Sequence, residues 1–304
     1  MLSWTIVEGY MHGLVLSGGG RKGAFQVGVL DVLAVRGARW EFLAGTSVGA
    51  INTSYLAAFP ASATVEGVEG LKRLWGQLDT RGVWKHWLLG PASGIWKSSF
   101  FNASPLHRLL RRELNEGAVR NSGRQLRLGI VQYGTGEYFE ATEKSTPLWQ
   151  YVAASSSYPG GLNPVELPEG MCGDGGVVSA TPLKGAIDAG CTKIDVVITD
   201  PLSAHPWRDQ DSGNGTRVSA LTIVMRSVAL LMHTAMVADV RRAMQVNQDV
   251  AEGRDVHHRM IELAVYAPDR PLSSGPLGSL DFNPEETQRL IAYGREVAES
   301  RSHS

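Results

Sequence analysis

Two glycine-framed turns near the start of this chain carry residues that could perform hydrolysis. The first turn, residues 17–23, contains three consecutive glycines followed by Arg21 and Lys22. The second turn, residues 45–49, has the pattern Gly-x-Ser-x-Gly around Ser47. This pattern places a serine hydroxyl on a tight turn between a strand and a helix, where it can act as a nucleophile. The first turn can present bare backbone N–H groups to the oxyanion that such an attack creates.

The segments around both turns explain why glycine is needed there. Residues 13–16 predict a short buried strand, and residues 24–36 predict the helix that follows it. Residues 42–44 and 48–59 repeat this strand–helix pattern around the serine. Glycine lets the backbone approach a ligand without a Cβ in the way, and a helix N-terminus adds partial positive charge.

The first turn alone leaves another function open, because Gly18-x-Gly20-x-x-Gly23 after a strand also fits a dinucleotide-binding turn. That alternative requires an acidic residue at the end of the next strand. Glu41 is about the right distance along the chain, but it stands at the start of that strand. A catalytically silent, membrane-associated protein on the same fold is a further alternative.

A third glycine-rich segment contains Asp174 followed by Gly175 and Gly176. Seen alone, an aspartate between glycines is usually a turn residue. Here, however, Gly-Gly-Gly-x-Lys-Gly, Gly-Thr-Ser-x-Gly and Asp-Gly-Gly follow one another in this order. With residues 153–160 before the aspartate and the long run 221–248 after it, the chain closely resembles the patatin-like phospholipase family over about residues 12–250.

The resemblance implies that Ser47 is the nucleophile and that Asp174 is its general base, in a dyad that needs no histidine. It also implies that backbone N–H groups of Gly18, Gly19 and Gly20 form the oxyanion hole. A carboxylate is a weak base unless burial raises its pKa, so the site should be dry. The remaining motif residues support this arrangement: Arg21, Lys22, Gly23, Gly45, Gly49, Gly175 and Gly176.

A Ser-His-Asp triad is the competing design, because five histidines follow Asp174 in the chain order that an α/β-hydrolase uses. None of them lies in a supporting local motif; they are His205, His233, His257, His258 and His303. The two cysteines, Cys172 and Cys191, suggest neither a disulfide framework nor a zinc site. We therefore expect no metal and no cofactor.

An aromatic segment between residues 83 and 101 invites a hypothesis about the substrate. It packs over the core, or it forms an entrance for acyl chains, since tryptophan suits a boundary between apolar and wet surroundings. Tyr158 stands where the family commonly has a small or aliphatic residue, which would affect the acyl pocket. The candidate entrance residues are Trp84, Trp87, Trp96, Phe100 and Phe101.

Length and composition indicate one domain spanning residues 1–304, with a patatin-like core and a strand and helix at about 259–300 packed on it. A chain of 304 residues with 43% hydrophobic content can bury a large core. The expected fold is α/β, a three-layer α/β/α sandwich with a mainly parallel central sheet. The net charge of −1 argues against a nucleic-acid partner.

No signal peptide is recognised, and charges interrupt the apolar segment 220–244, which favours a long core helix over a membrane span. We expect a cytoplasmic protein with peripheral membrane contact, and the oligomeric state stays open. The expected activity is that of a phospholipase A or lysophospholipase on phospholipid or other acyl-ester substrates. Acylglycerol lipase or general esterase activity is the alternative on the same fold.

Other segments give local predictions. A helix over 105–115 should be capped by Ser104, and residues 126–131 and 137–141 should form a hairpin. Asn283 should cap a final helix that runs to about Glu299.

Overall fold

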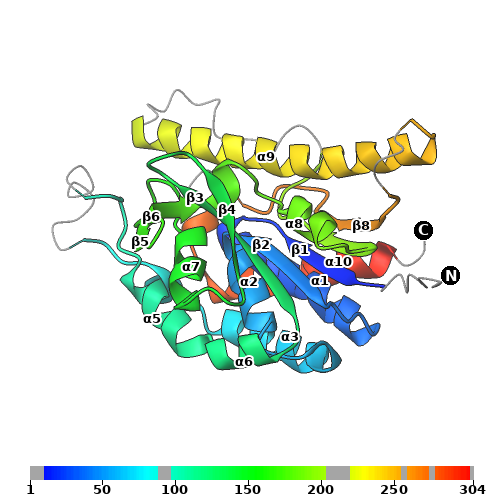
Figure 1. Cartoon of the computed structure of the whole chain (residues 1–304). Helices are drawn as coiled ribbons and strands as arrows, with labels where there is room; N and C mark the ends of the chain where they lie inside the picture. The colour runs from blue at the N-terminus through cyan, green and yellow to red at the C-terminus, as the bar shows by residue number, and fades with distance from the viewer. Residues whose placement is uncertain (1–9, 88–96, 203–219, 255–258, 274–277, 302–304) are drawn as a thin grey trace.

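A computed structural model describes residues 10–87, 97–202, 220–254, 259–273 and 278–301. Its centre is an eight-stranded sheet in the order β5-β6-β3-β2-β1-β7-β8, with β4 paired to β3 outside this path (Figure 1). The strands are β1 (His12–Leu16), β2 (Phe42–Thr46), β3 (Gln125–Gln132), β4 (Tyr138–Thr142), β5 (Val165–Leu167), β6 (Gly170–Asp174), β7 (Lys193–Val197) and β8 (Glu262–Tyr266).

The helices cover both faces of this sheet. The α-helices are α1 (Gly23–Val35), α2 (Val48–Leu56), α3 (Thr64–Gly76), α4 (Thr80–Val83), α5 (Ser104–Glu113), α6 (Glu116–Asn121), α7 (Leu148–Ser155), α8 (Leu183–Asp188), α9 (Ala220–Ala251) and α10 (Pro284–Ser300). Short 3₁₀ helices are η1 (Gly20–Lys22), η2 (Ala61–Ala63), η4 (Gly175–Val177) and η5 (Gly278–Leu280).

The sheet is mainly parallel, as predicted. β1 pairs in parallel with β2 and β7, β2 with β3, and β7 with β8. β4 and β6 both run antiparallel to β3, and β5 runs antiparallel to β6. Because parallel strands share one direction, their carboxyl ends form a common edge, where sites in α/β proteins are usually built.

Side chains that alternate along the strands divide the core into two layers. Phe42 and Ala44 of β2 belong to a cluster with apolar residues of α8 and α9, whereas Leu43 belongs to the larger cluster that contains α1, α2 and α3. Figure 1 shows α9 along one face of the sheet and α1, α2 and α3 along the other. The expected α/β fold is therefore confirmed.

Local predictions mostly agree with the structure, with one correction. β3 and β4 form the expected hairpin, and the Asn283 side chain accepts hydrogen bonds from the first turn of α10. The predicted Ser104 cap is wrong, because Ser104 is the first residue of α5 and its own N–H donates to Asn102 Oδ1 at 2.8 Å. The helix α5 thus begins one residue earlier than predicted, at Ser104 instead of Pro105.

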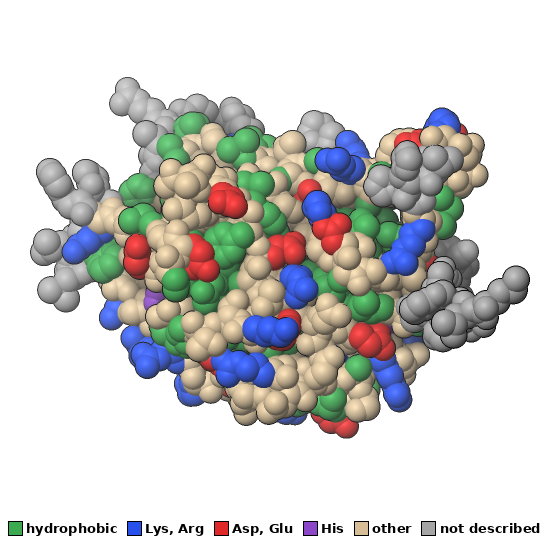
Figure 2. Space-filling view, viewed as in Figure 1, with side chains coloured by type: hydrophobic (Ala, Val, Ile, Leu, Met, Phe, Trp, Pro, Cys, Tyr) green, Lys and Arg blue, Asp and Glu red, His purple; other side chains and the backbone are tan. Residues whose placement is uncertain are grey.

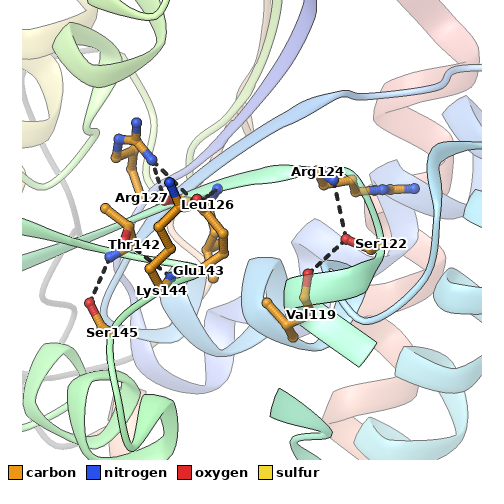
Figure 3. A network of polar contacts seen from close by, with 9 residues as sticks. All are labelled: Val119, Ser122, Arg124, Leu126, Arg127, Thr142, Glu143, Lys144 and Ser145. Atoms are coloured by element: carbon orange, nitrogen blue, oxygen red, sulfur yellow. Dashed lines mark hydrogen bonds and ion pairs between the residues drawn. The ribbon is translucent and has the colours of Figure 1, made fainter. Parts of the chain in front are cut away.

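Polar contacts fix the start of β3 and the segment that leads into it (Figure 3). Glu143 Oε2, just after β4, accepts hydrogen bonds from the Leu126 N–H at 3.0 Å and from Arg127 Nη1 at 3.5 Å. The Ser122 hydroxyl accepts from the Arg124 N–H at 3.2 Å. These contacts hold the register of the hairpin, and β3 is the strand on which the candidate site is assembled.

The long helix α9 packs against one face of the sheet. Met236 and Val240 are buried against the sheet, and Asp239 Oδ2 accepts hydrogen bonds from Ser179 Oγ at 3.1 Å and from the Thr181 N–H at 2.9 Å. Its segment Thr222–Ala251 is nevertheless long and apolar enough to cross a membrane, with a mean hydropathy of 1.5 in its most apolar window, of which 33% is buried. In the structure this helix has one buried face and one exposed face.

Candidate active site

Strand β3 brings the two candidate catalytic residues to one point. β4 occupies one edge of β3, so β2 and β6 share the other edge. β2 ends with Thr46 opposite Gly129, and β6 ends with Asp174 opposite the next residue, Ile130. Because the two strands run in opposite directions, they meet end to end. Ser47, directly after Thr46, is therefore placed at the junction with Asp174.

Ser47 stands in a strained backbone conformation. Its φ of 58° and ψ of −126° make it the one non-glycine residue with positive φ in the described part of the chain. The glycines at 45 and 49 permit this turn, since a Cβ on Gly49 would lie 2.2 Å from the Leu16 carbonyl oxygen and one on Gly45 would lie 2.3 Å from the Gly49 carbonyl oxygen. The sequence pattern thus produces the expected strand-to-helix elbow.

Three consecutive serines at the end of α7 connect the two sides of the junction. Ser155 Oγ accepts a hydrogen bond from the Ser47 N–H at 3.1 Å and donates to the Gly129 carbonyl at 2.7 Å. Ser156 Oγ donates to the Ser47 carbonyl at 3.2 Å, and the Ser157 carbonyl accepts from the Asp174 N–H at 3.3 Å. The sequence offered these serines only as part of a family resemblance, without a structural role.

Asp174 is fully buried. Its Oδ1 accepts a hydrogen bond from the Gly176 N–H at 2.8 Å, while its Oδ2 makes no hydrogen bond within the described residues. Burial raises the pKa of Asp174 to about 7, although hydrogen bonding from the nearby Ser47 hydroxyl and from Gly176 acts to lower it. The Ser47 hydroxyl is thus close enough to this carboxyl group to favour its ionised form.

The glycine turn lies between Ser47 and the end of β7. A Cβ on Gly18 would be 3.2 Å from Ser47 Cβ, and one on Gly19 would be 2.2 Å from Thr199 Oγ1. Gly19 and Gly20 have positive φ values of 153° and 58°. The Gly18 N–H donates to the Ala180 carbonyl at 3.1 Å, so in this conformation it does not serve a ligand.

The positive charges expected beside the glycine turn are paired. Lys22 Nζ lies 2.7 Å from Asp200 Oδ1, and both side chains are buried. Arg21 Nη2 lies 4.0 Å from Glu286 Oε1 in α10. The sequence reasoning missed Asp200, although its place just after β7, next to β1 in the sheet, is a signal that the strand order makes visible.

The remaining motif glycines allow close packing around the same junction. A Cβ on Gly175 would lie 2.5 Å from the Gly129 carbonyl carbon, and one on Gly23 would lie 2.4 Å from Val48 Cγ2. Gly176 supplies the N–H group that binds Asp174. These glycines hold β6, β3 and the helix starts close enough for the site to form.

A cavity of about 100 Å³ opens beside Ser47. Its wall from α3, α4 and α5 is apolar, and its wall from η1, the end of β7 and α9 carries Lys22, Asp200 and His233. The apolar lining residues are Val48, Ile51, Leu74, Trp75, Leu78, Val83, Leu106, Leu109, Tyr158, Leu162, Ala180, Ala229, Met232, Met236, Leu280 and Phe282.

The described aromatic residues of the 83–101 segment do not line the cavity. Trp84, Trp87, Phe100 and Phe101 are not among the residues that line the cavity, and Trp96 lies outside the described residues. The Trp84 ring packs against Phe101 with centroids 4.1 Å apart, and its Nε1 donates to the carbonyl of the lining residue Leu280 at 2.7 Å.

Of the five histidines that suited a triad by chain order, His233 alone falls among the described residues. It lines the cavity, but its Nδ1 faces Asp200 Oδ2 at 3.8 Å, and it makes no hydrogen bond to Ser47. His205, His257, His258 and His303 lie outside the described part.

Comparison with known protein families matches the part of the chain that contains the three motifs. A sequence model of the patatin-like phospholipase family matches residues 14–187. The chain belongs to this family. The match contains the glycine turn, the serine elbow and the Asp-Gly-Gly segment, and it ends before α9, which the resemblance had included.

Several known proteins are similar to about two thirds of this chain. "Lysophospholipase NTE1" of Candida glabrata is 26% identical over 231 residues, which are 69% of this chain and 12% of that protein. "Patatin-like phospholipase domain-containing protein 6" of Homo sapiens is 29% identical over 220 residues, or 68% of this chain and 15% of that protein. The chain thus matches only a small part of these relatives' length. The crystal structure of VipD from Legionella pneumophila has a TM-score of 0.48 and 15% identity, covering 96% of this chain and 67% of that one.

We predict that Ser155→Ala lowers kcat/KM for any ester by about 10-fold or more while the protein stays folded. The change leaves the buried Ser47 N–H without its acceptor, which costs about 1–3 kcal/mol and loosens the elbow. Ester hydrolysis and thermal unfolding measured together check this prediction. Ser227→Ala, at an exposed position on α9, is the matched control. Wild-type activity in Ser155→Ala would show that the elbow does not depend on this contact.

Proposed function

We propose that this chain hydrolyses carboxylic esters of lipids, with Ser47 as the nucleophile and Asp174 as the general base. One observation carries the proposal: a strained serine and a fully buried carboxyl group meet where β2 and β6 end on β3. Family membership supports lipid-ester hydrolysis at a general level. The dyad and its mechanism rest on the geometry.

The mechanism uses one carboxylate twice. Asp174 takes the Ser47 proton as Oγ attacks the ester carbonyl carbon, and the proton then passes to the leaving alcohol as the C–O bond breaks. Water then attacks the acyl ester of Ser47 while Asp174 takes its proton, and Asp174 returns this proton to Oγ as the acyl C–Oγ bond breaks and the fatty acid leaves. A pKa raised to about 7 makes this carboxylate a stronger base than an exposed aspartate.

We assign the oxyanion hole to the N–H groups of Gly19 and Gly20. Both glycines line the cavity beside Ser47, whereas the Gly18 N–H is bound to the Ala180 carbonyl. Each such donor contributes roughly 3–4 kcal/mol to transition-state stabilisation. Gly18 keeps a steric role, since a Cβ at this position would lie 3.2 Å from Ser47 Cβ.

A dinucleotide-binding function is disfavoured by the position of Glu41. Its Oε2 accepts a hydrogen bond from the His12 N–H at 3.0 Å, at the start of β1. The acidic residue of a dinucleotide site stands at the opposite, carboxyl end of the strands. The glycine turn therefore serves the serine better than it would serve a cofactor.

We predict that Ser47→Ala and Asp174→Asn each lower kcat/KM for a short ester by roughly 10³-fold or more, because each removes one half of the dyad. Wild-type kcat/KM should rise as the pH increases through about 7, since the base acts only when ionised. Ser47 should also react with a fluorophosphonate probe. Asp188→Asn, at an exposed pair with Lys184, is the control for the carboxyl change.

Stability measurements separate loss of chemistry from loss of fold. The pKa of Asp174 is about 7 in the folded protein against an ordinary 3.8, so the folded state binds the proton more tightly and loses stability as the pH rises from about 4 to 7. The melting temperature of Asp174→Asn should therefore rise relative to that of the wild type as the pH increases from about 4 to 7. Undiminished hydrolysis by Asp174→Asn would refute the dyad.

The apolar wall of the cavity is the proposed acyl-chain site. Leu109 in α5 is a half-buried lining residue, and Trp in its place would occupy volume that a long chain needs. Each buried methylene contributes about 0.8 kcal/mol, so we predict that Leu109→Trp lowers kcat/KM for a dodecanoyl-length ester at least about 10-fold more than for a butyryl ester. Trp87→Ala should leave this ratio unchanged. If Trp87→Ala changes this ratio and Leu109→Trp does not, the acyl-chain entrance lies at the aromatic segment instead.

We further propose that the exposed face of α9 contacts the lipid surface from which substrate is taken. Ile223, Val224, Leu230 and Leu231 are 44–63% exposed, while the opposite face of the same helix turns Met232 into the cavity. Figure 2 shows hydrophobic side chains on the surface along the upper edge, where α9 runs. A single helix thus joins the proposed membrane contact to the proposed site.

We predict that the double variant Leu230→Ser/Leu231→Ser binds phosphatidylcholine vesicles about 10-fold more weakly in a sedimentation assay, because two exposed apolar side chains are lost. Hydrolysis of a water-soluble ester should be unchanged. Met244→Ser, exposed at the far end of α9, is the control. Equal vesicle binding by all three proteins would exclude this face as the contact.

A further inference from the structure

A second polar group lines the cavity, apart from Ser47 and Asp174. It consists of Lys22 from η1, Asp200 from the segment after β7 and His233 from α9. All three side chains are at most 10% exposed. In a cavity that is otherwise mostly apolar, a few convergent polar groups usually fix the orientation of a ligand.

The charges of this group compensate one another. Lys22 Nζ lies 2.7 Å from Asp200 Oδ1, so the ammonium group is already neutralised. Burial alone would raise the pKa of Asp200, but Lys22 and His233 hold it below its ordinary value, so the carboxylate stays ionised. An anionic group entering here would meet that carboxylate. A neutral hydrogen-bonding group fits this wall better.

His233 supplies the free hydrogen-bonding capacity. Its Nδ1 faces Asp200 Oδ2 at 3.8 Å and has no hydrogen-bond partner in the described part of the chain. A proton on Nδ1 directed to Asp200 leaves Nε2, across the ring, as an acceptor. A hydroxyl group can donate to such a nitrogen and still accept from another donor.

The helix that carries His233 lies over Ser47. A Cβ on Gly18 would lie 3.2 Å from Ser47 Cβ and 3.8 Å from Met232 Cε, and Met232 directly precedes His233. A Cβ on Gly176 would lie 2.5 Å from the same methyl group. With the acyl chain along the apolar wall of α3 and α5, the alcohol part of an ester at Ser47 is left for the wall that holds His233.

We infer that His233, oriented by Asp200, determines specificity by hydrogen bonding to a free hydroxyl group next to the ester in the alcohol part of the substrate. The inference rests on the proposed function and names the substrate class: monoacyl esters of a polyol, with or without a phosphate headgroup. Lys22 holds Asp200, and the Asp200 carboxylate, 3.8 Å from Nδ1, favours this orientation of the imidazole electrostatically. A diacyl substrate lacks the hydroxyl and gains nothing from this wall.

The test compares each hydroxylated ester with its deoxy analogue. Wild-type protein and His233→Phe are assayed with 1-acyl lysophosphatidylcholine and its 2-deoxy form, and with 1-monoacylglycerol and the corresponding monoester of 1,3-propanediol. We expect the wild type to favour the hydroxyl-bearing member about 10–100-fold in kcat/KM. His233→Phe should reduce this ratio to about 1, and His233→Gln, which keeps an amide that can accept a hydrogen bond, should restore part of it.

The ratio is insensitive to the amount of folded protein, so partial unfolding of a variant does not obscure the result. Thr234→Val, which changes an exposed neighbour bonded only within α9, should keep the wild-type ratio. Equal preference in the wild type and His233→Phe overturns the inference, as does an equal loss on all four esters, which would point to water activation or structure. A wild-type ratio of about 1 in both pairs likewise overturns it. If wild-type protein fails to hydrolyse even a short nitrophenyl ester, the proposed function fails first.

Discussion

The arrangement of the site depends on one constraint: β3 is longer than β2, and β6 occupies the length that β2 leaves free. Hydrogen bonds along one strand therefore place the ends of two oppositely directed strands in adjacent positions. A side chain at the end of β2 and one at the end of β6 must then share a small space. Register, rather than a contact between the two side chains, brings Ser47 and Asp174 together.

The serines at the end of α7 reinforce this junction from a third direction. They bind the backbone of Ser47 on both sides and the N–H of Asp174, so the positions of the two residues are coupled through main-chain atoms. This support matters because Ser47 has a backbone conformation that side-chain-bearing residues rarely adopt. A single contact would leave such a turn free to relax, and the distance to the carboxyl group would change with it.

The sequence predicted the parts of the site that depend on local patterns. Ser47 and the glycine turn follow short apolar runs, and the strand-to-helix spacing there is fixed by neighbouring residues. Features that depend on strand order could not be predicted in this way. The pairing of Lys22 with Asp200 joins residues 178 positions apart, and it exists because β7 lies beside β1. The apolar wall of the cavity likewise combines residues of α3, α4 and α5. No single apolar segment of the sequence, including the aromatic segment, was therefore enough to predict it.

The order of the pieces along the chain has a consequence for biosynthesis. The strand-to-helix elbow with Ser47 comes early in the sequence, whereas β6, which carries Asp174, comes well over a hundred residues later, and α9 follows β6. A nascent chain that has emerged only as far as the β3–β4 hairpin contains Ser47 but not yet the proposed base, Asp174. The proposed site is therefore incomplete until β6 has been synthesised, and its cavity is complete only after α9 and the lining residues Leu280 and Phe282 have followed.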